Sequence, residues 1–273
     1  DEQVVEIIEA FLNKHYEFYG RQLDIVLVEG NCADSADLAC MRVDAQDVVG
    51  SEDPFAVSGA STEPFADEMA RLETINIINA VQSRDWYDTR APYAWSLPAD
   101  LNSVGENLTD FWCKKMTGKD AVHAGEEALV SMPRKLGIMV EENGIADVLA
   151  EKFMAEITGG VCGDADDAVM YKTAVGLFAS FDEYPTIISA MRQDEITTVV
   201  HFQGLFAAFL FEAQAFYPEE LGIGTGPQDG PINNRLQTPA VWDRFFGPAQ
   251  SPGQVRDEDT DVVSAMADVA PNF

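Results

Sequence analysis

Basic residues are scarce in this chain. Only 17 Lys and Arg residues stand against 47 Asp and Glu residues, which gives a formal net charge of −30 at pH 7. Nucleic-acid binding needs a basic patch that releases counterions from phosphates, and the sequence has no cluster of Lys and Arg to form one. The acidity has two open interpretations. One is a well-solvated surface, and the other is adaptation to high salt, with which the low count of 7 Lys agrees.

The excess of acidic residues predicts that salt stabilises the fold. Unscreened repulsion disfavours the compact state, and at about 1 M salt the Debye length falls to about 3 Å. We expect the melting temperature to rise between low salt and about 1 M NaCl in a thermal unfolding series. An unchanged melting temperature would contradict this prediction.

Metal-ligating side chains are also few and far apart. The three His residues are widely separated and the four Cys residues form no C-x-x-C pair, so the sequence gives no support for a zinc site. Cys32 and Cys40 flank a polar loop, and we predict that they form a local disulfide; the alternative is two unpaired thiols. A disulfide would imply an oxidising compartment and stabilise by about 2–3 kcal/mol. The spacing of Cys113 and Cys162 does not indicate whether these two pair.

The sequence lacks the motifs of common enzyme classes. It has no Walker loop, no G-x-S-x-G elbow and no G-x-G-x-x-G fingerprint. Adjacent acidic pairs are more typical of a solvated surface than of catalysis, and no base lies near Ser61 in the sequence. No run of 18 apolar residues occurs that could cross a membrane. We therefore expect no enzymatic activity, no cofactor and no membrane-spanning segment in this chain.

Apolar runs alternate with amphipathic stretches in the first half of the chain. We expect helices at 1–19, 43–49 and 64–72, strands at 22–29, 54–59 and 74–79, a polar and aromatic loop at 82–87, and an extended stretch at 92–97. A helix at 107–116 should follow. The order of these elements indicates a mainly parallel, doubly wound sheet.

A second α/β layer begins after a polar excursion at 117–133. We expect strands at 135–140, 168–174 and 196–202, helices at 144–157, 184–192, 205–216 and 238–246, and a loop at 247–261. This predicts two doubly wound α/β lobes. The boundaries are 1–133 for the first lobe, 134–230 for the second lobe and 231–273 for a loop-rich return segment.

Several stretches resemble the type I periplasmic substrate-binding proteins of ABC transporters, in particular the branched-chain amino-acid-binding group. The similar stretches are the turn at 57–62 with Pro64 and Ala66, the strand and turn at 76–83, the strand at 133–140, and the segments 191–204 and 211–226. The resemblance covers most of residues 1–246. It implies two lobes around a ligand cleft that closes about a hinge.

The chain departs from this family in two ways. The family begins with a strand before its first helix and completes its first lobe late in the chain. This sequence is therefore expected to be truncated at both ends, the alternative being an altered fold. Amino-acid binders of the family hold the ammonium group with an acidic residue and use tyrosines of the second lobe. The matching positions here are Asn143 and the turn 202–204, which leaves room for another small polar or aromatic ligand.

The resemblance implies a set of ligand-binding residues that follow the carboxyl ends of parallel strands, where open α/β sheets bind ligands. These residues are Ser61, Thr62, Gln82, Ser83, Trp86, Asn143, Phe202 and Gln203. Alternatively, Ser61 or Thr62 only caps the helix that follows, and Trp86 only packs at a sheet edge.

The resemblance implies an extracytoplasmic receptor that delivers a small polar ligand to the permease of an ABC importer. It implies a periplasmic or extracellular location, and leaves open membrane anchoring through a segment outside this chain. The alternative is a structural or interaction protein of the cell exterior that keeps the fold without transporting a ligand.

Overall fold

A computed structural model gives the fold of this chain. It describes most of the chain up to Phe202 and Gln203 and a few short stretches beyond them. The described residues are 2–32, 37–59, 62–78, 82–97, 99–142, 146–163, 165–174, 177–203, 211, 214–215, 217–221 and 244–247.

The first lobe contains a three-stranded parallel sheet in the order β1-β2-β3. Its strands are β1 (Ala56–Ser58), β2 (Ile75–Ile78) and β3 (Ala94–Ser96), and its helices are α1 (Glu2–His15), α2 (Leu38–Glu52), α3 (Glu63–Arg71) and α4 (Arg84–Asp88). Helices α2 and α3 cover one face of the sheet through a small core of Ala45, Phe65 and Met69, against which Val57 packs. The predicted strands at 54–59, 74–79 and 92–97 are confirmed.

The second lobe contains a five-stranded parallel sheet in the order β5-β4-β6-β7-β8. Its strands are β4 (Leu136–Glu141), β5 (Ala168–Thr173), β6 (Thr198–Phe202), β7 (Glu219–Leu221) and β8 (Phe245–Phe246), and its long helices are α6 (Asp147–Thr158) and α7 (Leu177–Gln193). The central strand β4 is buried from Leu136 to Val140. Its side chains reach two separate cores, one with α6 and one with α7, as expected for a sheet covered on both faces.

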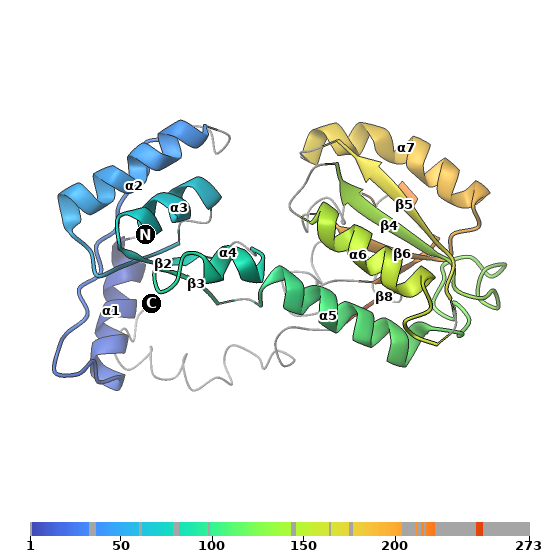
Figure 1. The fold of residues 1–273 in the computed structure, drawn as a ribbon, viewed down its shortest axis with the longest axis horizontal. Helices are drawn as coiled ribbons and strands as arrows, with labels where there is room; N and C mark the ends of the chain where they lie inside the picture. The colour runs from blue at the N-terminus through green and yellow to red at the C-terminus, as the bar shows by residue number, and fades with distance from the viewer. Residues whose placement is uncertain are drawn as a thin grey trace.

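Helix α5 (Leu101–Phe111) joins the two lobes, as Figure 1 shows. Asp100 caps it by accepting a hydrogen bond from the Ser103 backbone N–H at 2.9 Å, so the helix begins six residues before the predicted start at 107. It continues into a π-helical turn, Trp112–Met116. The buried side chains of Leu108, Trp112 and Met116 belong to the core of the second lobe.

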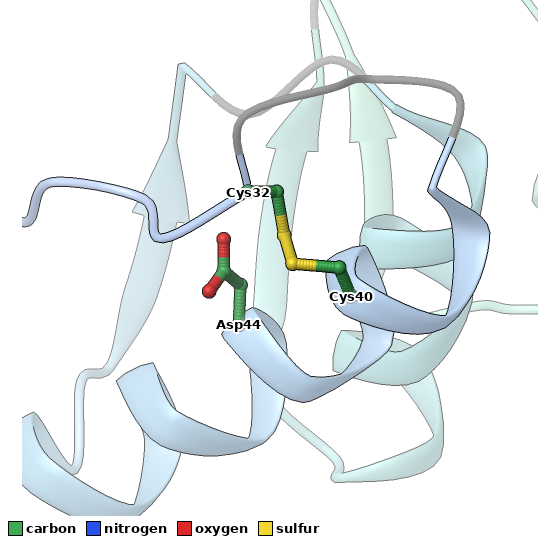
Figure 2. Close-up of side chains that lie close together, drawn as sticks. All are labelled: Cys32, Cys40 and Asp44. Atoms are coloured by element: carbon green, nitrogen blue, oxygen red, sulfur yellow. A yellow bond between two sulfur atoms is a disulfide. The ribbon is translucent and has the colours of Figure 1, made fainter.

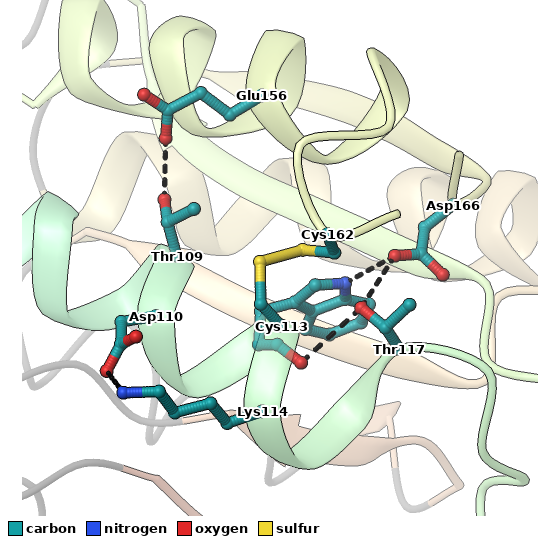
Figure 3. The surroundings of a disulfide bond; sticks show 9 residues. Thr109, Asp110, Cys113, Lys114, Thr117, Glu156, Cys162 and Asp166 are labelled. Carbon is teal, nitrogen blue, oxygen red and sulfur yellow. Dashed lines mark hydrogen bonds and ion pairs between the residues drawn. A yellow bond between two sulfur atoms is a disulfide. The ribbon is translucent and has the colours of Figure 1, made fainter. Parts of the chain in front are cut away.

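A disulfide fastens the end of this connection to the second lobe (Figure 3). Cys113, in the π-helical turn, is bonded to Cys162, which lies after α6. Beside it, Asp166 accepts hydrogen bonds from Trp112 Nε1 at 2.8 Å and from Thr117 Oγ1 at 3.0 Å. These contacts fix the end of the connection to α6 and to the segment that leads into β5. The sequence left this pairing open.

The predicted disulfide between Cys32 and Cys40 is confirmed (Figure 2). It ties the chain that enters the first lobe to the first turn of α2. Asp44, one turn further along α2, accepts a hydrogen bond from the Asn31 backbone N–H at 3.0 Å. Two independent contacts therefore hold the same short connection against α2.

Three predicted elements are wrong. The segment 22–29 has no assigned strand, because side chains of α1 take its backbone donors. Asn13 Oδ1 accepts from Leu23 N at 2.7 Å, and Glu9 Oε2 accepts from Ile25 N at 2.8 Å. The expected loop at 82–87 contains α4, which Ser83 caps. Of the expected helix at 238–246 the structure describes only residues 244–246. Two of these, Phe245 and Phe246, form strand β8 and pair with β7.

Other expectations fall partly outside the described residues. This applies to most of the predicted helix 205–216, of which only residues 211, 214 and 215 are described, and to the predicted loop 247–261 beyond Gly247. Helix α2 is described in full and is longer than the predicted 43–49.

The lobe boundaries at 133 and 230 stay a prediction. Strands β7 and β8 both belong to the second sheet, although β8 lies beyond residue 230.

Glu68 of α3 is buried, pairs with Arg71 of the same helix and binds Gln46 of α2, and these contacts predict a pH dependence of stability. Hydrogen bonds from Arg71 and Gln46, both 2.6 Å long, hold the pKa of the Glu68 carboxyl at about 2, below its ordinary value of 4.5. The folded state favours the charged form, so this contribution is fully present above pH 4.5 and is lost as the pH falls toward 2.

Glu68→Gln should therefore reduce the loss of stability on acidification, measured by urea unfolding between about pH 5 and pH 3. Glu52→Gln, at an exposed position of α2, is the control for loss of one surface charge. Equal acid sensitivity of the wild type and Glu68→Gln would contradict the assignment.

Candidate functional site

The carboxyl ends of the two parallel sheets lie on the sides of the lobes that face each other. In the first lobe, β3 leads at its carboxyl end into α5, which runs to the second lobe, and β1 and β2 are parallel to β3. In the second lobe, the strand arrows point toward the first lobe (Figure 1). Open α/β sheets bind ligands at the carboxyl ends of their strands, and in both lobes this edge is directed at the region between the lobes.

Two turns of the first lobe meet at this edge. Thr62 precedes α3 in extended conformation without capping it through its side chain, and its hydroxyl is buried with no partner among the described residues. Next to it, Glu63 Oε1 accepts a hydrogen bond from Trp86 Nε1 at 3.2 Å. This bond joins the start of α3, which follows Thr62, to α4, which contains Trp86. An unpartnered hydroxyl beside backbone N–H groups is suited to an acceptor such as a carboxylate.

Trp86 is held in place by more than sheet-edge packing. The Arg90 guanidinium lies 4.2 Å from the centroid of its ring, in a cation–π arrangement. Arg90 is itself fixed by Asp67, whose Oδ1 accepts from Arg90 Nη2 at 2.6 Å. The indole is half-buried, so part of it is available to a ligand and part is used in the fold.

Gln82 and Ser83 lie in the turn that follows β2. Gln82 is 6% exposed, and its backbone carbonyl accepts from Leu101 N at 2.9 Å, which joins the turn to the start of α5. Ser83 Oγ accepts from Trp86 N at 3.2 Å as the cap of α4. Ser83 therefore has a structural role in the described fold, and its contact with a ligand stays a prediction.

The second lobe presents a group of polar side chains at the ends of β5 and β6. Gln203 Nε2 donates to Thr173 Oγ1 at 2.7 Å, and Gln203 Oε1 lies 3.4 Å from His201 Nδ1. Thr173 is 2% exposed and His201 is 7% exposed. The Gln203 amide is thereby held at the carboxyl edge of the sheet, where it can present polar atoms to a ligand.

Phe202 lies below this edge, in the core. It is 6% exposed, and its ring centroid is 5.9 Å from that of Phe153 on α6. This placement gives Phe202 a role in packing, and the predicted role of covering an apolar part of a ligand stays a prediction. Ser61 and Asn143 lie outside the described residues.

The sequence interpretation missed Thr173, His201 and Glu63. Thr173 is the last residue of β5, so the rule that selected residues after strand ends could have found it. Glu63 gave no such signal, because its contact is with Trp86, which is distant in sequence. His201 gave none either, because its place at the site depends on burial.

One pocket of the first lobe lies away from the carboxyl edge. It has a volume of about 460 Å³ and lies between the last turns of α3 and the loop before β3. Its lining includes Asp67, Arg71, Arg90 and Tyr93. The two arginines already bind the carboxylates of Glu68 and Asp67, so the pocket has no strong free charge to offer a ligand.

Within the described residues, Cys32, Cys40 and Asp44 form a cluster whose ligand atoms lie within 4.8 Å of one another (Figure 2). Both sulfur atoms are used in the disulfide, and the carboxylate accepts from Asn31. Metal binding by Cys requires the thiolate, so the oxidised cluster is not suited to a metal ion.

Comparisons with known proteins support the fold. No protein family and no curated protein matches the chain by sequence. A solute-binding protein of an ABC transporter from Rhodopseudomonas palustris, solved with 3,4-dihydroxybenzoic acid, superposes with a TM-score of 0.56 at 16% identity, over 81% of this chain and 56% of its own. The leucine-binding protein LivK from Thermotoga maritima superposes with a TM-score of 0.59 at 13% identity, over 88% of this chain and 63% of its own.

A third solved structure covers nearly the whole chain. It is the branched-chain amino-acid binding protein LivJ from Streptococcus pneumoniae, in complex with isoleucine, with a TM-score of 0.67 at 11% identity, over 99% of this chain and 72% of its own. The chain thus spans between 56% and 72% of the lengths of these three proteins. It has the two-lobed α/β fold of type I periplasmic binding proteins.

A helix that crosses a bilayer must be long and apolar. In the part of the chain that the structure describes, none is both long enough and apolar enough to cross a bilayer.

Proposed function

We propose that this protein acts as an extracytoplasmic solute-binding receptor that delivers a small polar ligand to the permease of an ABC importer. The observation that supports the proposal is that polar side chains lie at the carboxyl edges of both sheets, Thr62 and Trp86 on one lobe and Gln203 and Thr173 on the other. Two disulfides agree with a periplasmic or extracellular location, where thiols are oxidised.

The ligand is expected to carry a carboxylate or a similar acceptor. Thr62 would donate its hydroxyl, and backbone N–H groups at the start of α3 would add a favourable local field. Gln82 and Gln203 would fix further polar atoms, while the half-buried Trp86 ring would cover an apolar part. Solved proteins of this fold have been determined with isoleucine and with aromatic acids, and both classes fit this description.

A thermal-shift screen against amino acids, amides and aromatic carboxylates tests the proposal, followed by calorimetry on each ligand that raises the melting temperature. Gln203→Ala should weaken binding by about tenfold or more, because a site that hydrogen-bonds its ligand loses about 1.5 kcal/mol with each such contact. Gln193→Ala, at an exposed position at the end of α7, is the matched control and should bind normally.

Failure of all ligand classes to shift the melting temperature would contradict the receptor function. That result would favour the alternative, a structural or interaction protein of the cell exterior with the same fold. Equal binding by Gln203→Ala and Gln193→Ala would leave the receptor function standing but remove Gln203 from the site.

A further inference from the structure

Helix α5 carries a sequence motif that the proposed function does not use. Asn107, Leu108 and Thr109 form the pattern Asn-x-Ser/Thr, the acceptor motif for N-linked glycosylation, and this pattern occurs only once in the sequence. The motif lies inside the helix, which begins at Leu101 and is capped by Asp100. Asn107 therefore does not cap the helix, which is the structural role in which asparagine is commonly found.

The three residues of the motif have different surroundings. Asn107 is exposed to solvent, whereas Leu108 is fully buried in the core of the second lobe. The Thr109 hydroxyl donates a hydrogen bond to Glu156 Oε2 of α6 at 2.7 Å (Figure 3). The inner side of α5 is thus held by the second lobe, and Asn107 lies on the outer side. A bulky polar group attached there would extend into water without disturbing the core.

Two disulfides agree with a compartment in which this modification takes place. Disulfide bonds persist in oxidising environments such as the cell exterior, and the described residues contain the pairs Cys32–Cys40 and Cys113–Cys162. N-linked acceptor motifs are used at the surface of secreted proteins, and Asn107 lies at the surface. The motif, the exposure and the cross-links therefore point to the same modification.

We propose that Asn107 is a site of N-linked glycosylation. A transferase of the host joins the side-chain amide nitrogen of Asn107 to the anomeric carbon of an oligosaccharide that is carried on a lipid phosphate. The bond between this carbon and the phosphate breaks, the amide nitrogen loses one proton, and the lipid phosphate is the leaving group. The product is an exposed glycan on α5, the helix that joins the two lobes (Figure 1).

The folded helix determines when the transfer takes place. Residues i and i+2 of a helix do not face each other, and here Asn107 is exposed while the Thr109 hydroxyl is bonded to Glu156. The acceptor motif consists of both side chains, so the transfer must precede the formation of α5. Folding of the modified chain then buries Leu108 and leaves the glycan in water.

Peptide mass spectrometry of the full chain, purified from its own organism, tests the proposal. We expect the peptide that contains Asn107 to carry additional sugar residues, which fragmentation should place on this asparagine. Asn107→Gln should abolish the modification completely. Thr109→Val should also abolish it, whereas Thr109→Ser keeps the motif and should retain it. Asn102→Gln, in the same helix but outside the motif, is the matched control and should remain glycosylated.

An unmodified Asn107 in the protein from its own organism would overturn the proposal. A glycan that persists in Asn107→Gln would also overturn it, since the sugar would then lie on another residue. So would a glycan that survives equally in Thr109→Val and Thr109→Ser, because the motif would then not be the acceptor.

The order of events has its own test. Membranes of the same organism supply the lipid-linked donor and the transferase, and the acceptor is the unmodified full chain, either folded or reduced and unfolded. We expect transfer to the unfolded chain and none to the folded chain, and equal transfer to both would contradict the assigned order. None of these measurements depends on ligand binding, so their outcome is separate from that of the receptor function.

Discussion

Replacing Cys113 and Cys162 by Ser is expected to lower the free energy of unfolding by about 4 kcal/mol. The two residues are 49 positions apart, and a cross-link stabilises chiefly by removing loop-closure entropy from the unfolded chain. The hydrogen bonds from Trp112 and Thr117 to Asp166 remain in the variant. They preserve the junction between α5 and the second lobe, so the loss is expected to come mainly from the unfolded state.

The pair Cys32 and Cys40 provides the internal control. Its separation of 8 residues predicts a smaller loss of about 2.5 kcal/mol on replacement of both by Ser. Urea unfolding of the two double variants and the wild type, under the same non-reducing conditions, measures the difference. An equal loss in the two variants would contradict the loop-length explanation.

Glu219→Gln is expected to destabilise the second lobe by about 3–5 kcal/mol, the usual cost of breaking a buried ion pair. The Glu219 side chain is 0% exposed and that of its partner Arg134 is 6% exposed, with Arg134 Nε 2.8 Å from Glu219 Oε2. The carboxylate also accepts from His123 N at 2.8 Å and from Thr198 Oγ1 at 2.9 Å. Neutralising it leaves the Arg134 charge in the interior without a counter-charge.

Asp110→Asn is the matched control for this experiment. Asp110 pairs with Lys114 at 2.7 Å, but both side chains are more than half exposed (Figure 3). An exposed pair of this kind contributes about 0.5 kcal/mol or less. If unfolding by urea gave similar losses for Glu219→Gln and Asp110→Asn, Glu219 would not have the stabilising role assigned to it.

The strands of the second lobe were predictable because their signal is local. A parallel strand that is buried on both faces is a continuous apolar run, as at 136–140, and the segment 196–202 is rich in the β-branched residues that favour strands. The segment 22–29 has a similar composition but is not a strand. Strand structure requires a neighbouring backbone, and the donors of Leu23 and Ile25 bond to side chains of α1 instead.

The candidate site was predictable only in outline. The rule that ligands bind at the carboxyl ends of parallel strands selected Thr62 and Gln203 from the sequence alone. It could not assign Phe202 to the core, because burial depends on α6, which brings Phe153 against that ring. Nor could it find the bond from Trp86 to Glu63, which joins two turns more than 20 residues apart.

The sequence by itself determined the net charge of −30, and it predicted the class of fold and the local disulfide, because these depend on composition, on local patterns or on residues close together in the chain. Only the tertiary structure decided that Cys113 pairs with Cys162 and that Glu219 neutralises Arg134. It also decided that Gln203 of the second lobe bonds to Thr173 at the end of β5. Each of these depends on which distant segments become neighbours, and that is set by the packing of whole helices and sheets.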